Sequence, residues 1–373
     1  MRCVAALVIA LAMQQPNFLP VQRLPAPAVL VTLASDYLHA VTLYRAGRLP
    51  EAIRLVDALP RDRFEAVVNA LQIARTGRDP RDLGLAAVDW SQQDLFAAGM
   101  LHGDMALAAL EPGGQGFEHD VRTALSLFDI ADTPRPDRHE AAGTSARDWL
   151  RAVSALLLAD NRDQEVESLV PYCQRLFPDD GPLLVTRGML AEYESTEIAA
   201  TSFDASVNRL ATVMDGRRAF LFEAVKAFEH AVQVMPESDE ARTRLGHVDA
   251  ALHRDQRAVP LLQTASASAN ERWAYLAMLT LGGIREREHN VSEAERLYRG
   301  AIAKVSGAQS AYVALALLQY GTGRRDESAQ TFDTLVARNT TRGAAADPWW
   351  LYAIGSVGPP RAALNALRAE ARR

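Results

Sequence analysis

The clearest pattern in the chain is a stripe of small and aromatic residues between positions 224 and 246. Ala224, Phe228 and Ala231 are spaced so that they share one face of a helix. Pro236 ends that helix, and a Leu-Gly pair follows in the next apolar run. Small residues let two helices approach closely, and an aromatic ring fills the space between them. The stretch therefore predicts the second helix of one hairpin, followed by the first helix of the next.

The same pattern recurs at a nearly constant interval. The small residue that opens each second helix advances by 34, 36, 34 and 34 residues, through Ala224, Ala258, Ala294, Ser328 and Ala362. Four positions further on stand Phe228, Leu262, Tyr298, Phe332 and Ala366. Each second helix also follows a Gly or polar turn, such as the one at residues 253–255. The alternative, an irregular helical bundle, would not keep this interval.

A Leu-Gly pair, then Ala-x3-Phe, then Pro, with a period of 34 residues, resembles the tetratricopeptide repeat (TPR). The resemblance covers residues 147–373 and 32–60, and between them it rests on continuity alone. It implies an all-α, right-handed α-solenoid of stacked antiparallel helical hairpins. The work it implies is that of a non-enzymatic scaffold that binds a protein or peptide partner. The alternative is an enzyme on an α/α helical array, for example one acting on carbohydrates.

The order of the chain predicts four parts. Residues 1–13 carry one Arg, an apolar run and an Ala-x-Ala-like site, which predicts a signal peptide and an exported bacterial protein, periplasmic or envelope-associated. If this segment is not a signal, the protein is cytoplasmic. Residues 14–31 are Pro-rich and predict an extended linker. Residues 32–146 are expected to form diverged hairpins, and 147–373 a TPR array.

Two irregularities interrupt the array. Val166 and Ala224 are 58 residues apart, which leaves about 24 extra residues, at 196–219, beyond one period. We expect them at a hairpin turn, either as part of a binding face or as a tolerated surface loop. The last repeat, 343–373, has Trp349, Trp350 and Tyr352 where small residues should stand. It is predicted to be an atypical capping repeat whose aromatics cover the end of the core, with ligand stacking as the alternative.

Composition narrows the classes of function. Acidic and basic residues are interspersed at a net charge of −6, so no basic stripe suggests a nucleic-acid partner. The apolar run at the N-terminus is too short to cross a bilayer comfortably, so no stable membrane span is expected in the mature chain. Cys3 and Cys173 are too few for a zinc site or a disulfide framework. Cys173 is expected to be a buried thiol, the alternative being a reactive one.

Motifs for chemistry are missing from the sequence. None of the eight histidines forms an H-E-x-x-H pair, and no G-x-x-x-x-G-K-[ST] or G-x-S-x-G motif occurs. We therefore expect no catalytic residue, no cofactor and no metal. The Lys and Asn set of a carboxylate clamp is also missing from the matching groove positions.

In a TPR solenoid the first helices line the concave face, and partner segments lie along it. Arg and aromatic side chains are enriched among the residues that dominate binding energy. The other positions that line the expected groove are mostly Ala, Leu, Val and Met, so a partly apolar peptide is the expected ligand. The alternative is that the Arg and aromatic residues at the inward positions are ordinary surface residues of the repeats. The inward positions of this type are Arg151, Tyr193, His247, Arg287 and Tyr320.

Overall fold

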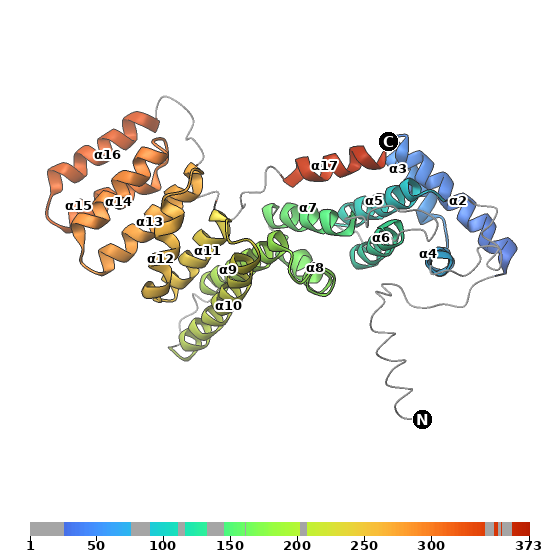
Figure 1. Ribbon diagram of the computed structural model, residues 1–373, viewed down its shortest axis with the longest axis horizontal. Helices are drawn as coiled ribbons and strands as arrows, with labels where there is room; N and C mark the ends of the chain where they lie inside the picture. Colours follow the sequence, from blue (N-terminus) through green and yellow to red (C-terminus); the bar gives the residue numbers. More distant parts are fainter. Residues whose placement is uncertain are drawn as a thin grey trace. The chain divides into compact units, whose positions relative to one another are not determined.

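The computed structural model describes residues 26–75, 90–110, 116–132, 145–160, 162–201, 207–339, 347–349, 352 and 360–373. Helices account for nearly all of these residues, and no strand occurs among them (Figure 1). This confirms the predicted all-α class. The chain divides into two compact units, Met1–Ala152 with Arg361–Arg373, and Val153–Pro360. The predicted signal peptide, residues 1–13, lies outside the described residues.

Unit 1 is built around the packing of α2 on its neighbours. α2 contacts α3, α4 and α5, and α5 forms an antiparallel pair with α6. Phe128 on α6 and Trp149 on α7 are fully buried against glycines of α5. The helices of unit 1 are α2 (Pro27–Arg45), α3 (Leu49–Asp57), α4 (Arg61–Arg75), α5 (Gln92–Ala108), α6 (Phe117–Asp132), the first half of α7 (Ser145–Ala159) and α17 (Pro360–Ala371).

Helix α2 begins earlier than the sequence predicted. The linker was expected to extend to residue 31, but the helix starts at Pro27. Proline is tolerated in the first helical turn, because its missing N–H has no partner there in any case. Leu30 is buried, so packing favours helix at this position.

Helix α17 joins unit 1 and does not complete the array of unit 2. Arg368 donates two hydrogen bonds to the buried Asp104 carboxylate, at 2.9 and 2.7 Å. Gln93 donates to the carbonyl of Glu370 at 2.7 Å, and Leu364 is buried. In Figure 1 the red helix α17 ends beside the blue α2, where the Arg372 guanidinium lies over a tyrosine ring of that helix. The predicted capping repeat 343–373 is therefore wrong as a single hairpin, because its second helix finds partners on α5.

Unit 2 is a series of antiparallel hairpins. α9 pairs with α10, α11 with α12, α13 with α14, and α15 with α16, and successive hairpins stack on one another. This is the predicted solenoid arrangement. After the end of α7, the helices are α8 (Asp163–Leu176), α9 (Gly181–Thr201), α10 (Val207–Val234), α11 (Asp239–Ala251), α12 (Asp255–Ser266), α13 (Glu271–Arg287), α14 (Val291–Lys304), α15 (Ser310–Gly321) and α16 (Arg325–Asn339).

A glycine on the first helix faces a large side chain on the second in three hairpins of unit 2. A Cβ atom added at any of these glycines would lie far inside van der Waals contact, so the helices can approach only because it is missing. This confirms the helix pairing predicted from the repeat. The added Cβ atom would lie 2.3 Å from the Phe228 side chain at Gly188, 2.6 Å from the Leu262 side chain at Gly246, and 2.2 Å from the Tyr298 side chain at Gly282.

The hairpin turns share one backbone solution. Two residues after the end of the first helix stands a residue with positive φ: Gly47 (78°), His253 (57°), His289 (58°) or Gly323 (84°). In each turn the next N–H reaches back to the carbonyl five residues earlier, at 2.8 to 2.9 Å. This Schellman arrangement satisfies carbonyls that the helix end would otherwise leave unpaired. It occurs at the turns that the sequence predicted.

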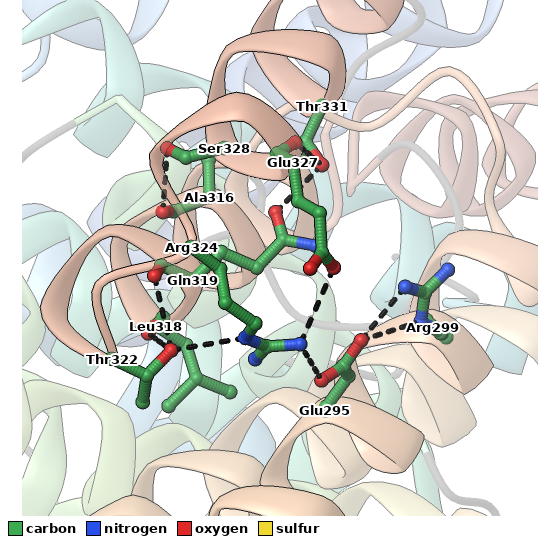
Figure 2. Close-up of polar contacts among 10 residues, drawn as sticks. All are labelled: Glu295, Arg299, Ala316, Leu318, Gln319, Thr322, Arg324, Glu327, Ser328 and Thr331. Carbon is green, nitrogen blue, oxygen red and sulfur yellow. Dashed lines mark hydrogen bonds and ion pairs between the residues drawn. The ribbon is translucent and has the colours of Figure 1, made fainter.

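The last hairpin is tied to α14 by charged side chains. Figure 2 shows the Arg324 guanidinium between two carboxylates, Glu295 at 2.8 Å and Glu327 at 3.3 Å. Beyond this hairpin the predicted aromatic cap does not cover α16. Phe332 and Val336 on that helix are 39% and 60% exposed.

The extra residues predicted at 196–219 lengthen two helices. α9 has 21 residues and α10 has 28, and both run into this range. The expectation of a loop is therefore corrected for all but residues 202–206, which lie outside the described part. The physical reason lies in the sequence, which has no Pro in this range and keeps good helix formers on both sides.

Gly282 and Gly283 are neighbours on α13 with different surroundings. Replacing Gly282 with Ala should lower the free energy of unfolding by about 1–3 kcal/mol, because the added Cβ would overlap Tyr298. That ring cannot withdraw freely, since its hydroxyl donates to Glu286 at 2.9 Å. Gly283→Ala should instead raise the free energy by about 0.5–1 kcal/mol, since nothing lies within 4 Å of the new methyl group. Denaturant titration followed by circular dichroism measures both, and equal effects would contradict this packing.

Candidate functional site

Two of the predicted site residues meet in one cavity of unit 2. Tyr193 on α9 and His247 on α11 both line a cavity of about 330 Å³. Residues of α7, α8, α9, α10 and α11 contribute to it, together with Trp349 and Tyr352. The first helices α9 and α11 thus supply part of its walls, and the second helices α8 and α10 supply another part.

The other three predicted residues lie elsewhere. Arg287 ends α13 and pairs with Asp255 at 2.7 Å. Tyr320 on α15 is 59% exposed. Neither lines the cavity. Arg151 is in unit 1, on α7, where its guanidinium lies 3.7 Å from the Asp148 carboxylate.

A buried arginine organises the floor of the cavity. Arg244 is fully buried on α11 and donates to Glu240, one turn earlier, at 2.9 Å. It also donates to Glu192 on α9 at 3.4 Å, and to the backbone carbonyl of Tyr352 at 2.6 Å. A buried charge is tolerated only when it is paired and hydrogen-bonded, and here each set of guanidinium N–H groups has an acceptor.

Tyr352 is held in the cavity by its hydroxyl and by its ring. The hydroxyl donates to the two oxygens of Glu192, at 3.0 and 3.2 Å. The Arg244 guanidinium lies 4.4 Å from the ring centroid, a cation–π distance. The His247 ring lies 5.1 Å from Tyr352 and 5.4 Å from Trp349. Of the aromatics predicted to cover the core, Tyr352 packs both here and against an apolar core cluster that includes Trp273 and Leu276, whereas Trp350 lies outside the described residues.

Asp347 fixes the other end of this short segment. Its carboxylate accepts from the backbone N–H of Ser310, the first residue of α15, at 2.7 Å. It also accepts from the N–H of Trp349 at 2.9 Å. The residue before α15, Gln309, gives no side-chain cap, so Asp347 supplies the acceptor that the helix end needs. We call residues 347–349 and 352 the strap.

Burial sets the protonation of the groove. It raises the pKa of Glu192 to about 7, against the lowering effects of Arg244 and Tyr352. Burial also lowers the pKa of His247 to about 4, helped by the positive charge of Arg244. At neutral pH His247 is therefore an uncharged ring, suited to packing against other rings.

The described residues offer little for metal or thiol chemistry. Among them, no group of three or more His, Cys, Asp or Glu side chains could hold a metal ion. Burial raises the pKa of Cys173 to about 12, which favours the inert thiol over the reactive one. No helix in the described part is both long and apolar enough to cross a membrane.

Sequence reasoning missed the residues that hold the strap. Glu192, Arg244 and Tyr352 were not among the predicted site residues. One signal was present: Arg244 directly precedes the Leu-Gly pair of its helix, and Glu240 stands four positions before it. A charged pair on a close-packed helix indicates a buried ionic site.

The hairpins, their period and the groove define a TPR-like α-solenoid. No protein-family model matches the chain, and no curated protein matches it. Among solved structures, "Crystal structure of MamA protein" matches at a TM-score of 0.38 and 17% identity, covering 53% of this chain and 96% of that one. "Human IFIT1 dimer with m7Gppp-AAAA" matches at 0.38 and 13% identity, covering 79% and 69%. Neither likeness is close enough to transfer a ligand or a partner to this chain.

The raised pKa of Glu192 predicts a pH dependence of stability. As pH rises from 4.5 to about 7, the unfolded chain releases a proton that the folded protein retains, so stability falls. Glu192→Gln cannot ionise. The free energy of unfolding of the wild type, minus that of the variant, should therefore decrease by about 1–3 kcal/mol across this window.

His247 acts in the opposite direction, since its contribution is lost as pH falls from 6.5 toward about 4. His247 is present in both the wild type and Glu192→Gln, so its contribution cancels when the two free energies of unfolding are subtracted. Urea titrations at several pH values measure the difference. A constant value across the window would show that folding does not raise the pKa of Glu192.

Proposed function

We propose that this chain is a non-enzymatic scaffold that binds a protein or peptide partner through the groove of unit 2. The supporting observation is that first helices of successive hairpins bring Tyr193, His247 and Arg244 to one cavity, whose wall also includes a separate segment of chain at Trp349 and Tyr352. A surface that donates a hydrogen bond to a main-chain carbonyl and packs against two aromatic rings has the features needed to bind an extended peptide.

The charge of the cavity favours a peptide over a nucleic acid. Its described lining includes two carboxylates, Asp163 and Glu192, and two guanidinium groups, Arg217 and Arg244. Arg244 is already paired with acidic side chains. A phosphate backbone is attracted by unneutralised Lys and Arg, and this lining has no such excess. We propose a partner segment that is partly apolar and aromatic.

An enzyme remains the second candidate, on one observation. Asp163 and Glu192 line the same cavity as three aromatic residues, and a carboxyl with a pKa raised to about 7 suits a general acid. Against this, both oxygens of Glu192 accept from Tyr352, and one also accepts from Arg244. Glu192 is thus engaged in holding the strap, which supports the scaffold.

Variants of the cavity test the scaffold function. Tyr193→Ala or His247→Ala should weaken partner binding by about 1–2 kcal/mol, because each removes a ring from the cavity wall. Quantitative affinity capture from a cell-envelope extract, with melting curves to confirm folding, measures the loss. Capture of the same partners in equal amounts by wild type and both variants would contradict the proposal and favour residues 196–219 as the contact surface.

Arg287→Ala and Tyr320→Ala, in the same unit but outside the cavity, test how far along the array the partner extends. We propose that a long partner also contacts these residues along α13 and α15, in which case the two variants weaken it by a similar amount. A partner confined to the cavity is unaffected by them. Arg151→Ala reports separately on α7.

Export is a further proposal, which rests on residues 1–13 of the sequence alone. Cleavage after Ala12 should leave a mature chain that lacks those first residues. Mass spectrometry of the protein from the native envelope measures its N-terminus. An intact Met1 in a cytosolic fraction would contradict export.

A further inference from the structure

The strap contacts the helices of unit 2 through side-chain and main-chain hydrogen bonds, and through the packing of Tyr352 against an apolar cluster that includes Trp273 and Leu276 on α13. Asp347 attaches it at α15, and Tyr352 attaches it between α9 and α11. Trp349 stacks on Tyr352 with ring centroids 6.3 Å apart and planes inclined by 20°, and it remains 36% exposed. None of the hydrogen bonds of the strap joins the first helix of a hairpin to its second, so the pairing within the described hairpins does not depend on those bonds.

The vacated groove would not be stable as it stands. Arg244 would lose its acceptor at 2.6 Å, and Glu192 would lose its hydroxyl donor. Both side chains are largely buried, at 1% and 13% exposure. Leaving a buried polar group unpaired costs about 1–3 kcal/mol. The groove therefore favours an occupant that replaces the same contacts.

Those contacts specify the chemistry of the occupant. Glu192 requires a hydroxyl donor, and Arg244 requires both a carbonyl oxygen and an aromatic face at 4.4 Å. The neutral ring of His247 provides a wall for one or two further rings. A tyrosine supplies the hydroxyl and the face together, and its own peptide carbonyl supplies the oxygen.

We infer that this cavity is a recognition site for a tyrosine- and tryptophan-bearing segment of a partner protein, and that the strap is an internal ligand that such a segment displaces. The inference rests on the proposed scaffold function and names the partner's chemistry. Because the strap is part of the same chain, its effective concentration is in the millimolar range, and a partner must compete with it. The strap therefore lowers the apparent affinity of the protein for the partner segment.

A peptide with the sequence of residues 345–354, labelled with a fluorophore, tests the inference on the full-length protein. Trp349→Ala with Tyr352→Ala vacates the cavity and leaves the groove residues in place. Fluorescence anisotropy should show that the vacated variant binds the peptide at least about tenfold more tightly than wild type does. A peptide with Phe in place of the tyrosine should bind the vacated variant about 3- to 10-fold more weakly, because Glu192 then lacks its donor.

Two further variants keep the test decisive. His247→Ala in the vacated background should weaken the peptide, whereas Tyr320→Ala, outside the cavity, should not. If the vacated variant fails to fold, Asp347→Ala takes its place, because it loosens the strap at α15 and leaves every cavity residue intact. It should then bind the peptide more tightly than wild type does.

Three results would overturn the inference. One is a folded vacated variant that does not bind at millimolar peptide. Another is equal affinity for wild type and the vacated variant, which would show that the strap does not compete. The third is a wild-type dimer, seen by sedimentation, that the peptide dissociates, since the occupant would then be the strap of a second copy. In each case, loss of partner capture by Tyr193→Ala would still support the scaffold function.

Discussion

The distance between the two helices of a hairpin is the constraint on which unit 2 depends. It is set where a glycine backbone meets a large side chain, as Gly188 meets Phe228. Helices that approach this closely stack at a regular interval, so equivalent positions on successive first helices fall side by side. The cavity follows from this regularity. Tyr193 and His247 face the same space because α9 and α11 are successive first helices.

Within this regular frame, the groove contains a buried charge that the fold itself does not need. In a purely structural groove the whole group of Arg244, Glu192 and Glu240 could be replaced by apolar residues, and such replacements of a complete buried ion-pair group are often neutral or stabilising. Arg244 lies between Glu240, Glu192 and the carbonyl of Tyr352, and this position gives it a role in recognition. It distinguishes a segment that offers the right acceptors from one that does not. Buried polar groups are costly when unmatched, and this cost is a source of specificity.

The structural features that could be predicted from the sequence are those that depend on residues close together in the chain. The hairpin turns at His253 and Gly323 and the pairing of Gly282 with Tyr298 follow from local spacing, and the structure has them. The cavity walls were predicted in part, at Tyr193 and His247. The strap was not, because Tyr352 and Glu192 are 160 residues apart and a repeat pattern describes only adjacent units. For the same reason the docking of α17 on α5 had no signal in the period.

The contact between Arg368 and Asp104 joins two parts of unit 1 that are 264 residues apart in the sequence, and that are therefore synthesised at different times. Asp104 is 4% exposed and also accepts from the hydroxyl of Tyr44. While the chain is being synthesised, this carboxylate exists for more than two hundred residues before its arginine emerges. Domains generally fold as units during translation, N-terminal parts first. Unit 1 cannot do so completely, because its folding must wait until α17 has left the ribosome, after all of unit 2 has been made.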